Sequence, residues 1–527
     1  MLQLPSSGER HREQVEVRIL TGREDEETVD VVVVGCGMVG LVLARLLALE
    51  DVRVALVDNM RLPRAFPRAT HLDDETMRTF QTLGLAHLEE GFSLMGVHRL
   101  YDAEWRPVME VDFSSKLTNQ NWQSDYQFHQ PHFEATLRGL AHSHPRSSHY
   151  FGWEAFEMTT ASDQASLRIR ERSSGEERTL KASYVVGCDG AHSFVRGQMD
   201  GTQLDYNAVH RSLIVDIYPF VEAKHLKGRD MFIHAGIRNP LTFVATNDPR
   251  LRFEQMLRPE DDANEFERND HVYELLSPWL APAEYLILRS DVYEWHAVVA
   301  ETWREGLLFV AGDAAHETPP HLGQGMCIGI RDAMNLAWKL ARVMRSESPP
   351  ELLDTYETER KPHATVYVSV AADMANQVEA MEPVGVEEGD EVPTIQMDTL
   401  RVRIGPGVRL DDSDESAGFQ SAQPRLADGQ LLDDAGGGYR FAVLGLPDCI
   451  AHIGRDAKVY LDALDAEVIA ADSDEARSWM QELGCAAVLI RPDHYIFGTA
   501  SAADELDALV ARLQAALTNR TIVGAGV

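Results

Sequence analysis

The fold of this chain is decided by VDVVVVGCGMVG at residues 29–40, which joins a strand to a glycine-rich turn. The β-branched run at 29–34 is typical of a parallel strand that is covered on both faces. The turn carries the pattern G-x-G-x-x-G at Gly35, Gly37 and Gly40, and the LVLARLLALE that follows has helical periodicity. In such a turn the first glycine permits the bend, the second admits a pyrophosphate, and the third lets helix and strand pack closely. The start of the helix would then offer its free N–H groups to the phosphates.

A second strand completes the unit. VRVALVD follows the helix and ends at Asp58, whose carboxylate would accept hydrogen bonds from a ribose. The whole strand–turn–helix–strand–acid pattern predicts a dinucleotide site. A glycine-rich turn in some other α/β protein is the alternative, and this motif alone does not separate NAD from FAD.

Two further motifs each end a strand in glycine and aspartate. KASYVVGCDGAHSFVR at 181–196 predicts a strand over Tyr184–Cys188, followed by Asp189-Gly190, a polar turn and Arg196. GDAAHETPPHLGQG at 312–325 follows a strand predicted over Leu307–Ala311 and opens a long amphipathic helix.

The three motifs, in this order, resemble those of the flavoprotein aromatic hydroxylases, the group that includes para-hydroxybenzoate hydroxylase and phenol hydroxylase. The resemblance covers roughly residues 28–370, and YETERKPHA at 356–364 is similar to the family's segment after the flavin-facing helix. It implies FAD as the cofactor. The fold class it implies is α/β: a Rossmann-like FAD-binding domain of para-hydroxybenzoate hydroxylase type, an inserted β-sheet substrate domain and a C-terminal thioredoxin-like domain.

The resemblance also implies a set of site residues. The cofactor-binding set is Gly35, Gly37, Gly40, Asp58, Arg68, Gln130, Asp189, Gly312, Asp313, Gly323, Gly325 and Met326. Asp313 ends a strand where its carboxylate could accept from a ribityl hydroxyl, and the helix after Gly325 would point its positive end at the flavin ring. The candidate catalytic residues are Pro319, which would stiffen the turn in front of the ring, and His321 in that turn, which could touch substrate. For Arg68, Gln130 and His321 the alternative is a surface or helix-capping role.

The middle of the chain indicates the branch of the family. LRFEQMLRPEDD at 251–262 and the segment 291–316 are similar to those of 3-(3-hydroxyphenyl)propionate hydroxylase and its relatives. We expect a strand with an ion pair or an interdomain contact at Arg252, Phe253 and Glu254. HRSLIVDIYPF, RDMFIHAGI and LTFVAT are predicted strands of the substrate sheet. The polar residues of this region from which a phenol-activating base could come are His210, Asp216, Tyr218, His234, Tyr293 and His296, and the sequence singles out none of them.

The domain boundaries expected from these patterns run in five parts. Residues 1–28 form a flexible lead-in, and 29–95, 129–203 and 297–375 form the FAD-binding domain. Residues 96–128 and 204–296 form the substrate domain, 376–415 an acidic linker, and 416–527 the C-terminal domain, where strands alternate with helices. That last domain has no C-x-x-C pair, so a structural or dimer-interface role is expected rather than a redox role.

The composition of the chain limits the classes of partner that it could bind. The formal net charge of −35 argues against a nucleic-acid or anionic-membrane partner. No stretch approaches the length of an apolar membrane span, no signal peptide is evident, and five scattered cysteines favour a cytoplasmic protein without a structural metal site. No second G-x-G-x-x-G follows a strand, so NADH or NADPH would bind transiently rather than in its own Rossmann domain.

The expected function is therefore an FAD-dependent monooxygenase that uses NAD(P)H and O2 to hydroxylate a phenolic compound, by way of the family's flavin C4a-hydroperoxide. The partners are a small aromatic substrate and O2, with a homodimer as a further expectation. Two alternatives stay open at this point. One is an FAD-dependent tailoring hydroxylase or epoxidase of a polycyclic natural product, and the other is a flavin-fold binding protein without redox chemistry.

Overall fold

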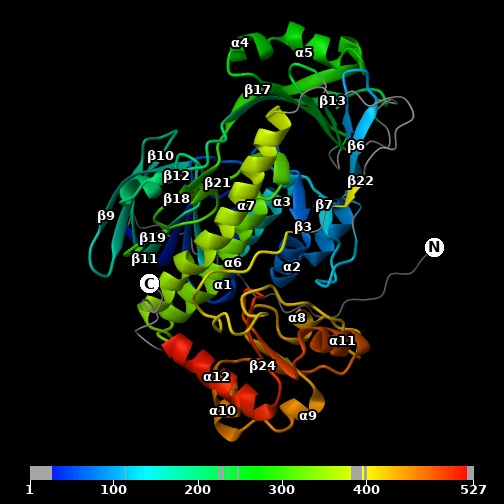
Figure 1. Cartoon of the computed structure of the whole chain (residues 1–527). Coiled ribbons are helices and arrows are strands. Elements are labelled where there is room, and N and C mark those ends of the chain that lie inside the picture. The colour runs from blue at the N-terminus through cyan, green and yellow to red at the C-terminus, as the bar shows by residue number, and fades with distance from the viewer. Residues whose placement is uncertain are drawn as a thin grey trace, which may run out of the picture.

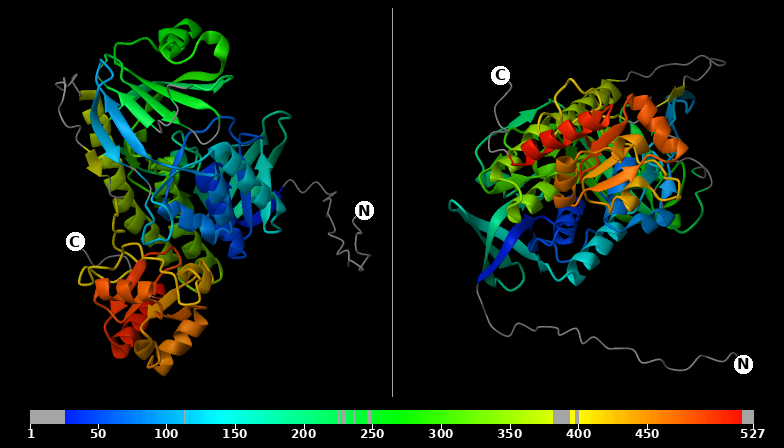
Figure 2. Two further views of the ribbon diagram at one scale, coloured as in Figure 1. Left: turned by 90° about the vertical axis from the view of Figure 1, so that its right-hand side faces the viewer. Right: turned by 90° about the horizontal axis from the view of Figure 1, so that it is seen from below.

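The computed structural model describes residues 26–112, 114, 116–223, 226, 231–235, 237–245, 249–380, 394–396 and 400–518. The elements form three tiers, seen one above the other in Figure 1 and from two further sides in Figure 2. The middle tier holds a mixed sheet with helices packed against it, the upper tier a curved, mostly antiparallel sheet, and the lower tier a small C-terminal unit.

The middle tier is built on the strand that opens the motif at 29–40. β1 (Glu26–Val34) pairs in parallel with β2 (Val54–Asp58) on one side and with β11 (Glu177–Gly187) on the other. The sheet order is β19-β20-β11-β1-β2-β8, and Val31, Val32 and Val33 in its centre are fully buried. The remaining strands of this sheet are β8 (Ser147–Phe151), β9 (Trp153–Thr160), β10 (Ala165–Glu171), β19 (Arg304–Glu305) and β20 (Leu308–Val310).

Four helices complete the middle tier. α1 (Met38–Leu49) packs against α3 (Gln130–Ser143) and α6 (Gly325–Met344), and α6 is buried along nearly its whole length. α7 (Asp354–Ala380) runs beside α6 toward the upper tier and carries Pro362 in its interior. The smaller elements here are α2 (Asp74–Thr82), β3 (His71–Asp73), β4 (Ser93–Leu94), β7 (Asp125–Gln127), β12 (Gln203–Asp205), β18 (Val298–Ala300) and β21 (His316–Glu317).

The upper tier is a sheet in the order β17-β13-β16-β15-β14-β5-β6-β22. Its strands are β5 (Val97–Tyr101), β6 (Pro107–Asp112), β13 (His210–Pro219), β14 (Met231–His234), β15 (Leu241–Ala245), β16 (Leu251–Leu257), β17 (Tyr285–Trp295) and β22 (Thr394–Gln396). Helices α4 (Ala263–Phe266) and α5 (Asn269–Leu276) cover one face. Leu213, Val215 and Phe253 belong to the core beneath them. Because side chains alternate along a strand, the residues next to these core residues in the sequence face the middle tier.

The lower tier is a four-stranded sheet in the order β24-β23-β25-β26, with β23 parallel to β24 and antiparallel to β25. Its elements are α8 (Leu432–Ala435), β23 (Ala442–Gly445), α9 (Pro447–Ile450), α10 (Arg455–Ala463), β24 (Glu467–Ala470), α11 (Asp474–Leu483), β25 (Ala487–Ile490), β26 (Ile496–Ala500) and α12 (Ala503–Thr518).

Buried ion pairs attach the lower tier to the middle one. Arg491 donates to Glu359 of α7 at 2.7 Å, and Arg78 of α2 makes a two-pronged contact with Asp433 at 2.6 and 2.7 Å. All four residues are nearly or fully buried. Such pairs are costly to break because the surviving charge stays out of water.

Most predicted elements are present, with informative differences. The strand predicted over Tyr184–Cys188 is the end of the longer β11, and the strand predicted over Leu307–Ala311 is confined to Leu308–Val310. Within the expected acidic linker 376–415, the last turn of α7 and β22 form regular structure, and β22 adds to the upper sheet beside β6. Residues 1–25 of the expected lead-in, and 381–393 and 397–399 of the linker, lie outside the described residues.

Candidate flavin and substrate site

The three sequence motifs meet at the carboxyl edge of the middle sheet. Backbone hydrogen bonds join neighbouring strand ends: Gly35 N–H donates to Val57 at 2.8 Å, and Cys188 N–H donates to Val34 at 2.7 Å. Ala311 N–H likewise donates to Gly187 at 2.9 Å. The chain leaves β1 toward β2 on one side and returns as β11 on the other, so this edge is a topological switch point, where open α/β sheets bind ligands.

The glycine turn after β1 has a different requirement at each glycine. Gly35 has φ +93°, and a Cβ there would lie 2.4 Å from the carbonyl oxygen of Cys188. A Cβ at Gly40 would lie 2.0 Å from the carbonyl oxygen of Gly35. A Cβ at Gly37, directly before α1, would meet no described atom within 4 Å. Gly35 and Gly40 are therefore required by packing, whereas Gly37 borders open space at the N-terminus of α1.

Asp58 closes the turn from the end of β2. Its carboxylate accepts from the N–H of Cys36 at 2.7 Å and from the N–H of Met60 at 2.6 Å. Arg138 of α3 contacts the same carboxylate and the Cys36 carbonyl, both at 3.4 Å. A carboxylate has about four acceptor positions, so Asp58 can still accept from a ribose. The sequence analysis did not identify Arg138, which reaches this turn from a helix 80 residues further along.

The residues of the second motif form hydrogen bonds with one another. The Asp189 carboxylate accepts from the Ser193 hydroxyl at 2.5 Å and from the N–H of Val195 at 3.2 Å. Burial raises the pKa of Asp189, although these hydrogen bonds oppose that effect. Arg196 donates to the Ala314 carbonyl at 2.8 Å, so it ties the second motif to the third.

The third motif carries one exposed carboxylate, and the helix after it carries a buried one. Asp313 is exposed between buried neighbours, and its carboxylate receives no hydrogen bond from the described residues. Asp332 of α6 is fully buried and accepts from the N–H of Gly312 at 3.1 Å and from Arg360 at 3.0 Å. His316 lies 2.7 Å from Asp332, not against Asp313. Asp332 therefore fixes the turn that presents Asp313.

The proline-rich turn contains the two predicted catalytic residues. Pro319 is buried, and His321 lies in the short helix Pro320–Leu322. His321 Nδ1 is buried without a hydrogen-bond partner among the described residues. Burial lowers the pKa of His321 to about 4, with a further contribution from His210, whose ring centroid lies 6.2 Å away. His321 is therefore neutral at pH 7.

The turn that opens α6 is held by a histidine which the sequence analysis did not single out. Gly323 has φ +68°, and its carbonyl oxygen lies 3.1 Å from Nδ1 of His71. His71 Nε2 lies 2.9 Å from the Asp125 carboxylate. Burial by itself lowers the pKa of His71, but Asp125 outweighs it and the pKa is raised. Because both ring nitrogens face oxygen acceptors, the imidazole donates from both and is cationic. Gly325 and Met326, which follow in the turn, are both half-buried.

Arg68 and Gln130 are brought together, but through the backbone of Arg68. Gln130 Oε1 accepts from the N–H groups of Arg68 and Ala69, at 2.8 Å each. Gln130 therefore orients the loop that carries the Arg68 side chain.

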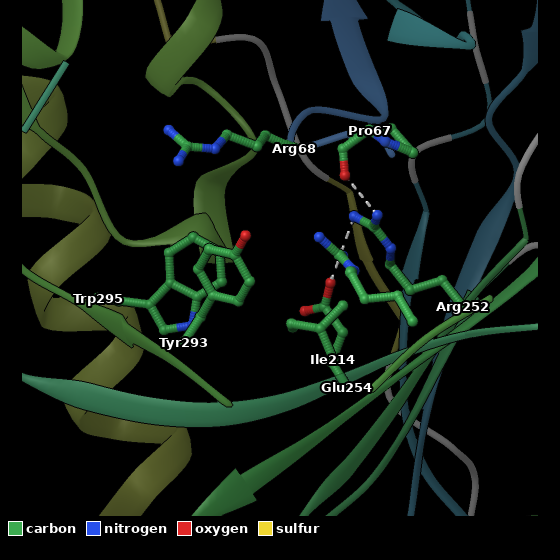
Figure 3. A pocket seen from close by; sticks show the side chains of 8 residues that line it. Pro67, Arg68, Ile214, Arg252, Glu254, Tyr293 and Trp295 are labelled. Atoms are coloured by element: carbon green, nitrogen blue, oxygen red, sulfur yellow. Dashed lines mark hydrogen bonds and ion pairs between the residues drawn. The ribbon is translucent and has the colours of Figure 1, made fainter. Parts of the chain in front are cut away.

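A small pocket that is partly open to solvent lies where that loop meets the upper sheet (Figure 3). Its lining residues are Pro67, Arg68, Ile214, Arg252, Glu254, Arg289, Tyr293 and Trp295. Arg252 donates to Asp216 at 2.8 Å and to the Pro67 carbonyl at 2.5 Å, so the ion pair and the interdomain contact expected for the 252–254 segment are both confirmed. Arg289 shares the same Asp216 at 3.0 Å.

Three polar groups in the lining residues have no hydrogen-bond partner in the described part of the chain. Arg289 Nε and Trp295 Nε1 are buried without one. The Glu254 carboxylate has only the Arg252 guanidinium, at 3.8 Å. In Figure 3 the rings of Tyr293 and Trp295 lie on one side of the pocket, and Arg252 and Glu254 on the other.

The six polar candidates of the substrate region are separated by the sheet. Tyr293 lines the pocket, Asp216 holds its arginines, and His210 lies beside His321. Tyr218 is exposed at the far end of β13, and His296 pairs with Glu294 at 3.1 Å on the surface. His234 stacks on Trp105 at 4.0 Å, away from the pocket.

The residues of this edge fit FAD on two observations. The space beside Gly37 at the start of a 12-residue helix suits a pyrophosphate, and the unpartnered Asp313 suits a hydroxylated chain. The described residues hold no cluster of three or more His, Cys, Asp or Glu side chains that could bind a metal ion. Nor is any helix in the described ranges long and apolar enough to cross a membrane.

Comparisons with known proteins agree with this geometry. A family model described as "FAD binding domain" matches residues 28–371. The chain is 30% identical over 515 residues to a "Probable NADH-specific resorcinol 4-hydroxylase" of Rhodococcus jostii (strain RHA1), which covers 93% of this chain and 96% of that protein. It is 31% identical over 472 residues to a "3-(3-hydroxy-phenyl)propionate/3-hydroxycinnamic acid hydroxylase" of Mycolicibacterium gilvum (strain PYR-GCK), covering 84% and 80% of the two chains.

Among solved structures, aklavinone-11 hydroxylase, in its complex with FAD and aklavinone, superposes with a TM-score of 0.78. The match has 24% sequence identity and covers 92% of this chain and 99% of that one, so it shows a shared fold.

The fold is that of an α/β protein whose candidate nucleotide site lies at a switch point of the sheet. The chain belongs to the FAD-binding domain family matched at residues 28–371. It is an FAD-dependent monooxygenase, an oxidoreductase.

Proposed function

We propose that this protein hydroxylates a single-ring phenol with O2, using NADH as the electron donor. The observation that carries the proposal is the pocket between the Arg68 loop and the upper sheet. It combines an aromatic wall, Tyr293 and Trp295, with unmatched polar groups on Glu254, Arg289 and Trp295. A few unmatched polar groups that converge on a hollow beside aromatic side chains are typical of a small-molecule site. NADH is proposed from the name of the Rhodococcus relative.

The charge of the pocket supports a neutral phenol. Arg252 and Arg289 already share Asp216, and Glu254 lies beside them, so the two cations of the sheet face two carboxylates. The charges of the sheet are therefore balanced, which suits a resorcinol-type substrate, and a phenylpropionate carboxylate could pair only with Arg68 of the facing loop. The fold shared with aklavinone-11 hydroxylase keeps a polycyclic substrate, acted on by a tailoring oxygenase, as the second candidate.

The predicted site residues fall into four groups in this proposal. Gly37 admits the pyrophosphate in a turn whose packing requires Gly35 and Gly40, Asp58 binds the ribose, and Asp189 closes the neighbouring turn. Gly312 and Asp313 receive the ribityl chain. Gly323, Gly325 and Met326 carry the flavin ring at the start of α6. Arg68, held by Gln130, lies along the cofactor.

Bound FAD would supply reducing equivalents from NADH to O2 and so deliver an electrophilic oxygen atom. The chain's own residues bind and orient the phenol, exclude water and move its proton. Pro319 and neutral His321 would close the side of the site that faces His210 and Trp295. Because Arg252 bonds to Pro67, the wall of the pocket is fixed to the FAD-binding tier.

Finer features of the molecule belong to the same proposal. The upper sheet would be the substrate domain, made by 96–128 and 204–296. The lower tier would be thioredoxin-like, which its strand order β24-β23-β25-β26 and the terminal helix α12 support. Without a C-x-x-C pair it would be structural or form part of a homodimer. We also propose a cytoplasmic location, with no nucleic-acid or membrane partner.

The proposal is tested by incubating the FAD-loaded protein with NADH or NADPH and a panel of resorcinol, 3-(3-hydroxyphenyl)propionate and a fused-ring phenol. We expect resorcinol to stimulate NADH oxidation and to yield a product one oxygen atom heavier, labelled when 18O2 is supplied. Product from the fused-ring phenol alone would support the second candidate. NADH oxidation that yields only hydrogen peroxide with every phenol would contradict both.

A further inference from the structure

Glu254 is the one carboxylate among the residues that line the pocket. It projects from the middle of β16 on the face opposite Phe253, which lies in the core under α5. Its register partner on β13 is Ile214, an apolar residue that also lines the pocket. The carboxylate is therefore placed at the site by the strand that carries it, beside an apolar partner on β13 and beside Thr242 on β15.

The groups around Glu254 leave its acceptor positions open. Arg252, on its own strand, is 3.8 Å away and directs its shorter bonds to Asp216 and Pro67. Arg289, on β17, pairs with Asp216 at 3.0 Å. The other polar neighbours around the pocket are Tyr293 on β17 and Arg68 on the loop after β2. Glu254 thus differs from Asp216, whose oxygens are engaged by two arginines, and its side chain remains 20% exposed.

We propose that Glu254 is the catalytic base that accepts the phenol proton of the substrate. This inference rests on the proposed function and names a residue for a step which the sequence left without one. A half-buried carboxylate without a hydrogen bond gains one when a hydroxyl donates to it, and this gain orients the phenol oxygen toward β16. Burial, together with the nearby Asp216, raises the pKa of Glu254 above its ordinary value despite Arg252 and Arg289. A base with a raised pKa is a better match for a weakly acidic phenol.

The step balances as follows. The phenol O–H bond breaks, its proton goes to the Glu254 carboxylate, and the electron pair stays on the substrate as phenolate. The phenolate ring forms a carbon–oxygen bond with the electrophilic oxygen supplied by O2 and the reduced cofactor of the proposed reaction. The hydrogen on that carbon is then lost to solvent as a proton, and Glu254 returns its proton to the ring oxygen. NADH is oxidised, one oxygen atom enters the substrate, and the other leaves as water.

The test replaces Glu254 by Gln, which has nearly the same shape and cannot accept a proton. The matched control is Glu294→Gln, the same change at an exposed position of β17 outside the pocket. For resorcinol at pH 7, Glu254→Gln should lower kcat by roughly 10²–10⁴-fold, the usual size of a general-base contribution. The control should be unchanged, and both variants should retain FAD. Glu254→Asp, which keeps a displaced carboxylate, should recover part of the loss.

Three readouts separate a base from a residue that only supports Arg252. The wild-type profile of kcat against pH should have an acidic limb, which Glu254→Gln should lose. The variant rate should instead rise with pH toward the pKa of the phenol. With fluorinated resorcinols, which ionise more readily, the loss of kcat in Glu254→Gln relative to wild type should be smaller. A positioning role predicts the same loss of kcat for every phenol.

The outcomes distinguish this inference from the function on which it rests. A wild-type enzyme that hydroxylates resorcinol, with a Glu254→Gln rate within threefold of it, overturns the base assignment alone. A deficit that is independent of pH and of substrate acidity does the same. Wild-type enzyme that hydroxylates no phenol overturns the proposed function and the base together. If Glu254→Gln fails to retain FAD, the test uses the profile of kcat against pH in wild type and in Glu254→Asp instead. The absence of an acidic limb from both profiles rejects the proposal.

Discussion

At the scale of single residues, Gly37 and Gly40 lie in one turn but differ in what a methyl group would meet. We expect Gly37→Ala to fold, because its φ of −75° suits alanine and the added Cβ meets no described atom within 4 Å. The methyl group would occupy space through which a pyrophosphate approaches, so FAD affinity should fall at least tenfold. Fluorescence titration of the apoprotein with FAD measures the loss, and its melting temperature checks the fold.

Gly139→Ala is the matched control, because its Cβ also meets nothing within 4 Å and it lies in α3, away from the turn. It should bind FAD as the wild type does. Equal FAD affinity for Gly37→Ala and Gly139→Ala would contradict the placement of the pyrophosphate.

His71 gives a prediction whose sign depends on pH. Its pKa is raised in the folded protein through the hydrogen bond to Asp125, so its contribution to stability is present below the unfolded value of about 6.5 and lost as the pH rises through the folded value. His71→Asn should destabilise the protein by about 1–3 kcal/mol at low pH, because it leaves Asp125 or Gly323 without its partner. The difference in melting temperature from wild type should therefore be larger at pH 6 than at pH 9.

His87→Asn, at an exposed position, serves as the control and should behave as wild type at both pH values. A His71→Asn deficit that grows with pH would contradict the cationic assignment.

At the scale of elements, the joint between α7 and the C-terminal sheet depends on a buried ion pair. Burial alone would raise the pKa of Glu359, but Arg491 and Lys339 hold it at about 2. Arg491→Met should cost about 3–5 kcal/mol, since it leaves buried carboxylates short of a partner. Because a lowered pKa contributes stability that is lost on acidification, the variant should also unfold at a higher pH than wild type during acid titration.

Arg440→Met removes an arginine from an exposed pair with Asp465 and is the control for Arg491→Met. Thermal melting and limited proteolysis of the C-terminal unit measure both variants. Equal protection of the unit in the two would show that the buried pair does not hold it.

The helices and strands differ in how well the sequence predicts them. β1, α1 and β2 are predicted well, because valine runs, helical periodicity and glycine spacing are local signals. The same holds for α6 and for the C-terminal strands. His71, Arg138 and Glu254 were not identified as site residues, because each owes its place to a contact made across the fold. His71, for example, meets Gly323 from 252 residues away, and Glu254 is assigned to the pocket only by the packing of β16 over the Arg68 loop.

At the scale of the whole molecule, the buried guanidinium of Arg252 is one of the contacts that join the upper sheet to the middle tier. Arg252 divides its bonds between Asp216 of the sheet and the Pro67 carbonyl of the tier below, and its side chain is only 4% exposed. A lysine is a single point charge and cannot reproduce this forked geometry. Arg252→Lys should therefore loosen the wall of the pocket against the loop of Arg68 while leaving both sheets folded.

A looser wall admits water to the reacting oxygen, so the variant should release more hydrogen peroxide and less hydroxylated product per NADH consumed. The ratio of product to NADH, measured with peroxide in the same samples, gives the coupling directly. Arg99→Lys, in the exposed pair with Glu110 on the same sheet, should keep the wild-type ratio. Neither variant changes the charge of the molecule. A fall in coupling for both would therefore show that coupling depends on the upper sheet in general. A fall for Arg252→Lys alone would assign it to the joint between the two tiers.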